Sequence, residues 1–268
     1  MALILIALIH NNNQERMASC REVVRYLQSE LSASQHKVQV KEFWEQEPIQ
    51  TASRLSWLKA RLRAARSQYV YTRFHLQQAP RFWLPYLLGS LDVIQVLSCT
   101  KKKLRFWEVE KIVTRKHISA WNAGSEFDFT IVVEDDAVVG KDLNLLAPIL
   151  LMEVTRSIES GSATYLDIAG GYPLDLIATK HSIVQDGFVS ATIVFTNTAC
   201  VYGFNRFLAK AMSDAVTRAP KMRELGVDFL MNALFLEISN SSSRCVHFTM
   251  DAIRHGSMDG KYKSWTQE

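Results

Sequence analysis

Apolar and polar residues follow one another along the chain at the spacings of strands and helices, beginning at the N-terminus. Residues 3–9 form an unbroken aliphatic run, which is typical of a strand buried on both faces. Residues 15–31 place Val24 and Leu31 on one side of a helix, and residues 38–43 alternate as a second strand would. This β-α-β order predicts the opening half of a Rossmann-like sheet.

The pattern continues to the C-terminus and predicts one α/β domain over residues 1–268. Helical spacing occurs at residues 52–67, 84–97, 106–121, 143–160, 207–216 and 227–237, and strand-like runs occur at residues 129–133, 165–168, 190–195, 199–204 and 246–250. We therefore expect a mixed sheet flanked by helices. Residues from about 50 to 113 would form a helical insertion into that domain.

The composition is that of a folded protein. The chain has 268 residues, of which 48% are hydrophobic, and its 11 glycines and 6 prolines are too few for a disordered chain. Four scattered cysteines lack the paired spacing of zinc ligands, so we expect no zinc site. The N-terminal apolar run lacks a basic leader and is shorter than the about 20 residues of a membrane span. We expect a cytoplasmic protein.

Charge is distributed unevenly along the chain. Residues 54–116 carry 14 lysines and arginines against 3 acids, so the rest of the chain is net acidic. A basic surface attracts phosphate-bearing partners, namely anionic lipid, phosphorylated glycan or nucleic acid. The basic amphipathic helix at residues 52–67 would ordinarily be a solvated face, and its Trp57 and leucine face make peripheral docking on the inner membrane the alternative. We expect no nucleic-acid partner.

The candidate chemistry lies in three consecutive carboxylates, Glu134, Asp135 and Asp136, which follow the apolar run at residues 129–133. Adjacent carboxylates repel one another, and Mg²⁺ or Mn²⁺ removes that penalty because these ions prefer oxygen ligands. The end of a buried strand is also where α/β sheets bind ligands. The triplet therefore predicts a metal and diphosphate site, against the alternative of a solvated turn.

Residues 116–139, KHISAWNAGSEFDFTIVVEDDAVV, resemble glycosyltransferase family 25, the lipopolysaccharide and collagen galactosyltransferase group. That family carries a Ser-His-x-x-x-Trp helix and then a strand that ends in Glu-Asp-Asp. His117, Trp121 and the acidic triplet match this spacing, whereas Lys116 replaces the serine. Weaker similarities follow in the family's order as far as residues 255–257.

The resemblance implies a GT-A fold and an inverting, metal-dependent transfer of a sugar. The donor would be a nucleotide sugar, often UDP-galactose, and the acceptor a hydroxyl of a glycan or glycolipid such as lipopolysaccharide or its O-antigen. Glu134 and Asp136 would approach the metal and the nucleotide, with His255 as a further metal ligand or else a surface histidine. Asp135 would lie beside them on the other face of the strand.

Two further residues are candidates for contacts with the nucleotide. Arg16 follows the first strand and would reach the diphosphate, unless it is an ordinary arginine of a helix surface. His117 shares a helix face with Trp121, so it would either contact nucleotide or acceptor or be a buried structural residue.

Inverting transfer also needs a carboxylate that accepts the proton of the acceptor hydroxyl. Asp228 opens a predicted helix and is one candidate, although capping the helix would explain it equally well. Asp167 is the other, because it ends a predicted strand before Gly170 and Gly171, where it could also simply begin the turn.

Two other functions fit the same carboxylates. A metal-dependent nucleotidyltransferase or hydrolase would use them on phosphate, although the chain has no P-loop. A non-catalytic module that binds glycan or nucleotide would keep the fold, although it would not need the intact triplet at 134–136.

Overall fold

The computed structural model describes residues 1–44, 56, 101–170, 182–185, 187–192, 196 and 199–257. The predicted helices at residues 52–67 and 84–97 lie outside these ranges apart from Ser56, and so does most of the predicted basic insertion. Its last part belongs to a helix that runs from Lys101 to Gly124 without a break at residue 113. The division of the chain into a domain and an insertion stays a prediction.

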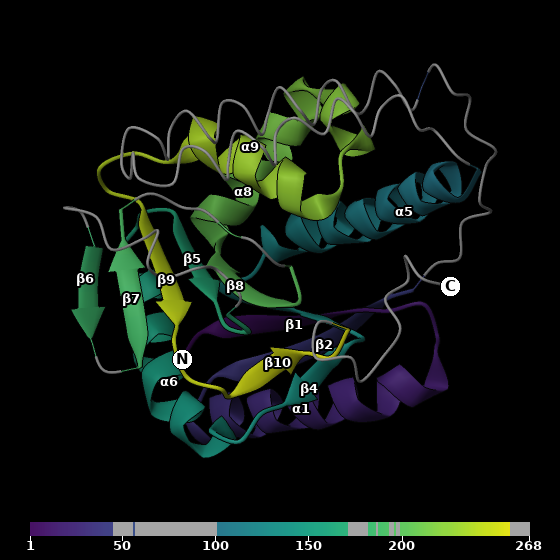
Figure 1. The fold of residues 1–268 in the computed structure, drawn as a ribbon. Coiled ribbons are helices and arrows are strands. Elements are labelled where there is room, and N and C mark those ends of the chain that lie inside the picture. Colours follow the sequence, from purple (N-terminus) through teal and green to yellow (C-terminus); the bar gives the residue numbers. More distant parts are fainter. Residues whose placement is uncertain are drawn as a thin grey trace.

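Within the described residues, eight strands form one mixed sheet in the order β2-β1-β3-β8-β5-β9-β7-β6 (Figure 1). Their bounds are β1 Leu3–Ile9, β2 Lys37–Phe43, β3 Phe129–Glu134, β5 Thr164–Asp167, β6 Ser182–Gln185, β7 Phe188–Ala191, β8 Val201–Asn205 and β9 Arg244–Phe248. β1 is parallel to β2 and β3, and β5 is parallel to β9. β8 is antiparallel to both β3 and β5, and the hairpin β6–β7 adds to β9 in antiparallel fashion.

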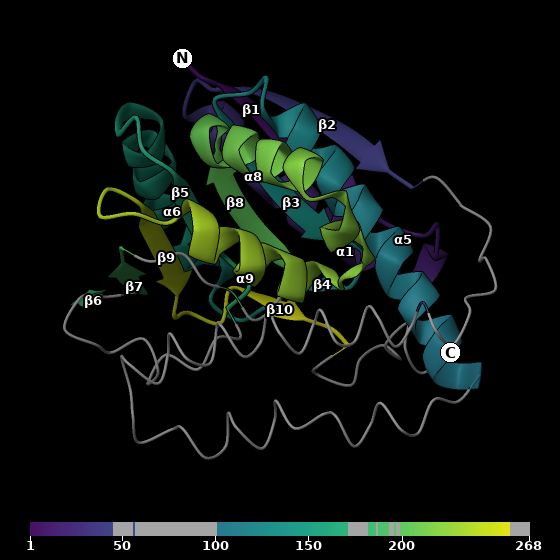
Figure 2. The ribbon, with the colours of Figure 1, turned by 90° about the horizontal axis from the view of Figure 1, so that it is seen from above.

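Helices cover both faces of this sheet. Their bounds are α1 Gln14–Ala33, α5 Lys101–Gly124, α6 Leu143–Glu159, α8 Arg206–Arg218 and α9 Val227–Ile238, with a short 3₁₀ helix η2 at Pro220–Glu224. Figure 1 shows α1 and α6 on one face and α5, α8 and α9 on the other, and Figure 2 shows the second group lying over the strands. Each face has its own apolar core. The predicted mixed α/β sheet flanked by helices is confirmed.

The opening β-α-β unit is present as predicted, because residues close in the sequence stabilise both its first strand and the start of its helix. β1 is aliphatic and buried along almost its whole length. The side chain of Asn13 then caps α1 by accepting from the backbone N–H groups of Glu15 and Arg16, which would otherwise lack partners at a helix start. The loop after β1 and the start of α1 are thereby held at the carboxyl end of the sheet.

A small ribbon beside the main sheet has no counterpart among the predicted elements. β4 (Ala137–Val139) pairs in antiparallel fashion with β10 (Ile253–His255), so that His255 lies opposite Ala137. Three residues are too few for a periodic pattern to reveal a strand. The predicted strand at residues 190–195 also differs, since β7 begins earlier at Phe188 and ends at Ala191 in the hairpin with β6. The ribbon brings a late segment of the chain back to the acidic triplet.

Candidate functional site

The acidic triplet lies where β3 ends, at the same edge of the sheet as the end of β1. Glu134 is the last residue of β3 and pairs with Ile9, the last residue of β1. Asp135 and Asp136 then form the turn into β4. Because the strand stops at Glu134, the alternation expected for Glu134 and Asp136 does not continue, and each of the three carboxylates meets different partners.

Glu134 is held by a buried chain of hydrogen bonds that begins on α5. Nε1 of Trp121 lies 2.8 Å from the Tyr202 hydroxyl, which lies 2.8 Å from Nδ1 of His117. Nε2 of His117 lies 2.8 Å from Oε1 of Glu134. The indole N–H can only donate, so with Glu134 accepting, Tyr202 donates to Nδ1 and the imidazole is neutral. Burial, with the charge of Lys116, agrees with this by lowering the pKa of His117 to about 3.

Asp135 turns to the loop after β1. Its Oδ2 accepts from the backbone N–H of Asn11 at 3.1 Å, and its Oδ1 lies 3.6 Å from Nη1 of Arg16. Burial outweighs these contacts and raises the pKa of Asp135 to about 6. The structure therefore places Arg16 as a buried partner of Asp135, not on a helix surface.

Lys116 is also buried in this region. Its ammonium group donates to the carbonyl oxygen of His10 at 2.7 Å and to the side chain of Asn11. Burial lowers the pKa of Lys116 to about 8, although Asp135 opposes the effect. The lysine thus ties α5 to the loop that also holds Asp135.

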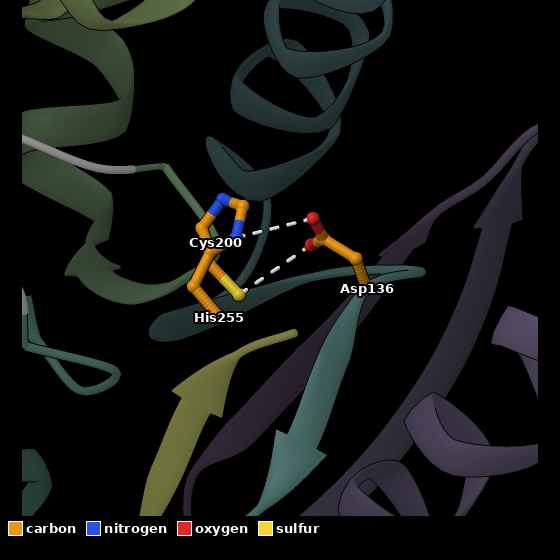
Figure 3. A group of neighbouring side chains, drawn as sticks. All are labelled: Asp136, Cys200 and His255. Carbon is orange, nitrogen blue, oxygen red and sulfur yellow. Dashed lines mark hydrogen bonds and ion pairs between the residues drawn. The ribbon is translucent and has the colours of Figure 1, made fainter. Parts of the chain in front are cut away.

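Asp136 meets a histidine and a cysteine from distant parts of the chain (Figure 3). Its Oδ2 lies 3.2 Å from Nδ1 of His255, and its Oδ1 lies 3.6 Å from Sγ of Cys200. One ligand atom from each of the three residues lies within 4.8 Å of the others. The Ser257 hydroxyl donates to Oδ2 as well. Carboxylate, imidazole and thiol together are a set that could hold a metal ion.

Strand pairing explains why these three side chains meet. The β4–β10 register sets His255 opposite Ala137, and the N–H of Gly256 donates to the carbonyl oxygen of Asp136 at 2.8 Å. Cys200 directly precedes β8, and its carbonyl oxygen accepts from the N–H of Glu134 at 2.8 Å. The cluster is therefore fixed by the backbone on all three sides.

Of the predicted metal ligands, the structure brings Asp136 and His255 together and directs Glu134 to His117. Cys200 takes the third place, and sequence reasoning missed it. The only signal was its position directly before an apolar strand, which says nothing about metal binding. An oxygen and a nitrogen ligand suit Mn²⁺, but a sulfur ligand is foreign to Mg²⁺.

Asp228, the first candidate base, is the second residue of α9, and Gly226 is the N-cap. The N-cap position is therefore not occupied by Asp228, and Oδ1 of Asp228 is buried with no hydrogen-bond partner among the described residues. Burial raises the pKa of Asp228 to about 8, and the charges of Glu134 and Asp167 act in the same direction. Asp228 therefore lies in the field of the other carboxylates.

Asp167, the second candidate base, ends β5 and is fully buried. Its Oδ2 lies 2.9 Å from Nδ1 of His247, the residue opposite it on β9, and Nε2 of His247 lies 3.1 Å from Sγ of Cys245. Burial opposes protonation of His247, but Cys245 and Asp167 outweigh it and raise the pKa of His247 to about 10. Oδ1 of Asp167 has no hydrogen-bond partner within the described ranges.

Glu134, Asp136, Asp167 and Asp228 thus lie close enough to one another or to Cys200 to shift pKa values. Glu134, Asp136 and Asp167 all raise the pKa of the buried Cys200 thiol, after burial itself. Burial and then the charge of Asp136 raise the pKa of Glu134 well above its usual range. Such a concentration of negative charge is costly, and a cation bound nearby would relieve it.

In the part of the chain that the structure describes, no helix combines the length and the apolar character needed to cross a membrane. The proposed membrane-docking helix at residues 52–67 lies outside that part.

Comparisons with known proteins identify no family. No protein-family model matches the chain, and no curated protein matches its sequence. One solved structure that matches is of a glycosyltransferase involved in the glycosylation of the major capsid of PBCV-1. It is 11% identical with a TM-score of 0.30, over 81% of this chain and 68% of that one. A similarity this weak says nothing about the function of this chain.

Proposed function

We propose that the chain is a glycosyltransferase. It would move a hexose such as galactose from a nucleotide sugar, most simply a UDP-sugar, to a hydroxyl of a glycan or glycolipid such as lipopolysaccharide. The observation that carries the proposal is the meeting of Asp136 and His255, 3.2 Å apart, at the carboxyl end of the central strand β3. Both were expected at a metal-diphosphate site from the sequence, Asp136 as part of the acidic triplet and His255 from the resemblance, although they are far apart in the sequence.

The proposal gives the surrounding residues separate tasks. Asp136 and His255 would hold a divalent cation, Mn²⁺ or Mg²⁺ on the sequence argument, which neutralises charge on the departing diphosphate. His117 orients Glu134, and Arg16 orients Asp135, because each basic side chain is buried against one carboxylate. These contacts fix the nucleotide-binding edge before the donor arrives, which avoids reorganisation during the reaction.

The chemical step would be a single displacement with inversion at the anomeric carbon. The acceptor oxygen forms a bond to that carbon while the bond to the diphosphate oxygen breaks, and the electron pair leaves with the nucleotide. Asp228 or Asp167 takes the proton of the acceptor hydroxyl. A pKa of about 8 would set Asp228 close to the working pH, which is where a general base is effective.

Calorimetric titration of UDP, GDP and CMP into the purified chain tests the proposal. Each nucleotide is titrated with Mn²⁺, with Co²⁺ and with a chelator. We expect metal-dependent binding of one nucleotide, abolished by Asp136→Ala and kept by Asp214→Ala, an exposed acid on α8. Folded protein that binds none of the nucleotides would contradict the proposal. Binding without sugar transfer would favour the non-catalytic module, and phosphate release would favour the phosphate enzyme.

The membrane part of the proposal rests on the basic segment at residues 54–116. A glycolipid acceptor would bring the protein to the cytoplasmic face of the inner membrane, where lysine and arginine are attracted to anionic lipid. Sedimentation with vesicles tests this separately. Equal binding to neutral and anionic vesicles would refute an electrostatic contact.

A further inference from the structure

We propose that Asp136, Cys200 and His255 form a thiolate-containing metal site that selects Zn²⁺ or Co²⁺ over Mg²⁺ and Mn²⁺. The inference concerns the ion alone, and it stands whether or not the chain transfers a sugar. It departs from the ion expected from the acidic triplet and from the expectation of no zinc site, because the sequence did not place Cys200 in the cluster.

The spacing of the donor atoms fits a tetrahedral ion. Zinc bonds of about 2.0–2.1 Å to oxygen and nitrogen and about 2.3 Å to sulfur put a bound oxygen about 3.4 Å from the nitrogen and about 3.6 Å from the sulfur. In the structure His255 Nδ1 lies 3.2 Å from one carboxylate oxygen of Asp136, Oδ2, and Cys200 Sγ lies 3.6 Å from the other, Oδ1. One ligand atom of each residue lies within 4.8 Å of the other two, so rotation of the Asp136 carboxylate would present one oxygen to an ion that the other two residues also reach. An ion could enter with small rotations of the three side chains.

The chemistry of the donors selects the ion. Mg²⁺ binds oxygen and holds its waters, so it gains little from a sulfur and a nitrogen ligand. Affinity for a mixed site of nitrogen, oxygen and sulfur rises from Mn²⁺ to Co²⁺, and a thiolate favours Zn²⁺. Cys200 would release its proton to solvent when it binds the ion. Its sulfur is fully buried and already faces the carboxylate.

The surroundings also suit a site that remains open to a substrate. Three protein ligands leave a fourth tetrahedral position, as in catalytic zinc sites. Asp136 is buried, but the His255 side chain is 23% exposed, so the cluster reaches solvent on the histidine side. The Ser257 hydroxyl donates to Asp136 and would hold the carboxylate in place.

Cobalt titration of the metal-free full-length chain is the test. We expect one Co²⁺ per chain with a sulfur-to-cobalt charge-transfer band in the near ultraviolet. Stoichiometric Zn²⁺ should remove the band, whereas a large excess of Mg²⁺ or Mn²⁺ should not. Cys200→Ser should abolish the band and weaken Zn²⁺ binding at least about tenfold, since even changes outside the ligand set cost that much. Cys20→Ser, which changes a buried cysteine of α1, is the matched control and should keep the band.

Two further measurements test the metal site if Cys200→Ser does not fold. X-ray absorption of the zinc-loaded wild-type chain should show one sulfur neighbour at about 2.3 Å. His255→Gln changes a partly exposed side chain and should weaken Zn²⁺ binding in a folded protein. A zinc spectrum without sulfur, or equal affinity for Zn²⁺ and Mg²⁺, would overturn the inference. Neither result bears on nucleotide binding with Mn²⁺, so failure here and failure of the proposed function are distinguishable.

Discussion

Glu134, Asp135 and Asp136 are consecutive, yet their carboxylates meet an imidazole, an arginine with a backbone N–H, and a thiol with a second imidazole. Substitution of each of these three residues should therefore have a different effect. Exchange of Glu134 disturbs a hydrogen-bonded chain, whereas exchange of Asp136 removes a candidate metal ligand. Single substitutions at these positions can therefore separate an effect on metal binding from an effect on stability.

The Tyr202 hydroxyl links Trp121 to His117 in the core. Tyr202→Phe leaves a buried indole N–H and a buried imidazole nitrogen without partners, which should lower the free energy of unfolding by about 1–3 kcal/mol. Tyr26→Phe is the control, because it removes a half-buried hydroxyl that donates to the carbonyl oxygen of Leu143 and bridges no two buried side chains. Urea unfolding measures the free energy of unfolding of both variants. An equal loss in the two would contradict the buried chain of hydrogen bonds through Tyr202.

Asp228 should make stability depend on pH. Its pKa is about 8 in the folded chain and about 3.9 when unfolded. Between these values the folded state binds the extra proton, so the contribution of Asp228 to stability is present at low pH and is lost as pH rises toward 8. Asp228→Asn should therefore lose less stability from about pH 5 to pH 8 than the wild type, as followed by urea unfolding. Asp214→Asn should match the wild type, and parallel curves for all three proteins would refute the assignment.

Elements of this fold are joined at a few polar or tightly packed positions. Asn205, at the end of β8, caps α8 and also binds β5, the last turn of α6 and the segment after α6. Gly140 follows β4 and lies against the backbone before β10. Both positions hold together segments that are distant in sequence. Substitution at either position should therefore weaken the contacts between those segments as well as the local turn.

Asn205→Ala removes two hydrogen bonds that the side-chain oxygen accepts, from the N–H groups of Leu208 and Thr164. It also removes donation to the carbonyl oxygens of Ser157 and Ser162. With these groups left buried, we expect a loss of about 2–4 kcal/mol in the free energy of unfolding. Asn13→Ala, which removes only the cap of α1, should cost about 1 kcal/mol. Similar losses for the two variants would show that Asn205 acts only as a cap.

Gly140→Ala should displace β10. The added Cβ would lie 2.1 Å from the backbone oxygen of Asp251, so the chain must move and the hydrogen bond from Gly140 N–H to Ala252 would weaken. We expect lower stability together with weaker Zn²⁺ binding, because His255 moves with β10. Gly161→Ala has open space and only its positive φ to oppose it, so it should cost about 1–2 kcal/mol and leave metal affinity unchanged. Competition with a zinc indicator measures the affinity.

At the scale of the whole molecule, the bound ion should stabilise the fold. An ion that binds only the folded state at about 100 times its dissociation constant adds about 2.7 kcal/mol. Thermal unfolding should therefore shift upward with Zn²⁺ and return after chelation. The shift should be clearly smaller in Cys200→Ser at the same Zn²⁺ concentration, and a shift of equal size there would place the ion elsewhere.

The spacing of apolar residues along the chain predicted the elements that form from residues close in the sequence. The long strands and helices and the β-α-β opening follow from runs of apolar residues, and Asp136 and His255 were candidates from short motifs. Cys200 was not, because its place beside Asp136 depends on β8 pairing in antiparallel fashion with β3. The burial of Arg16 against Asp135 likewise depends on how α1 packs under the sheet. Contacts between distant segments leave no periodic signal in the sequence.

The ribbon of β4 and β10 has a consequence for how the protein matures. Asp136 and Cys200 are synthesised well before His255, and His255 arrives only when β10 docks on β4. A nascent chain that has not reached residue 255 would carry two of the three ligands and lack the imidazole of the third. Metal capture would then report that synthesis has passed residue 255 and that β10 has folded back onto β4.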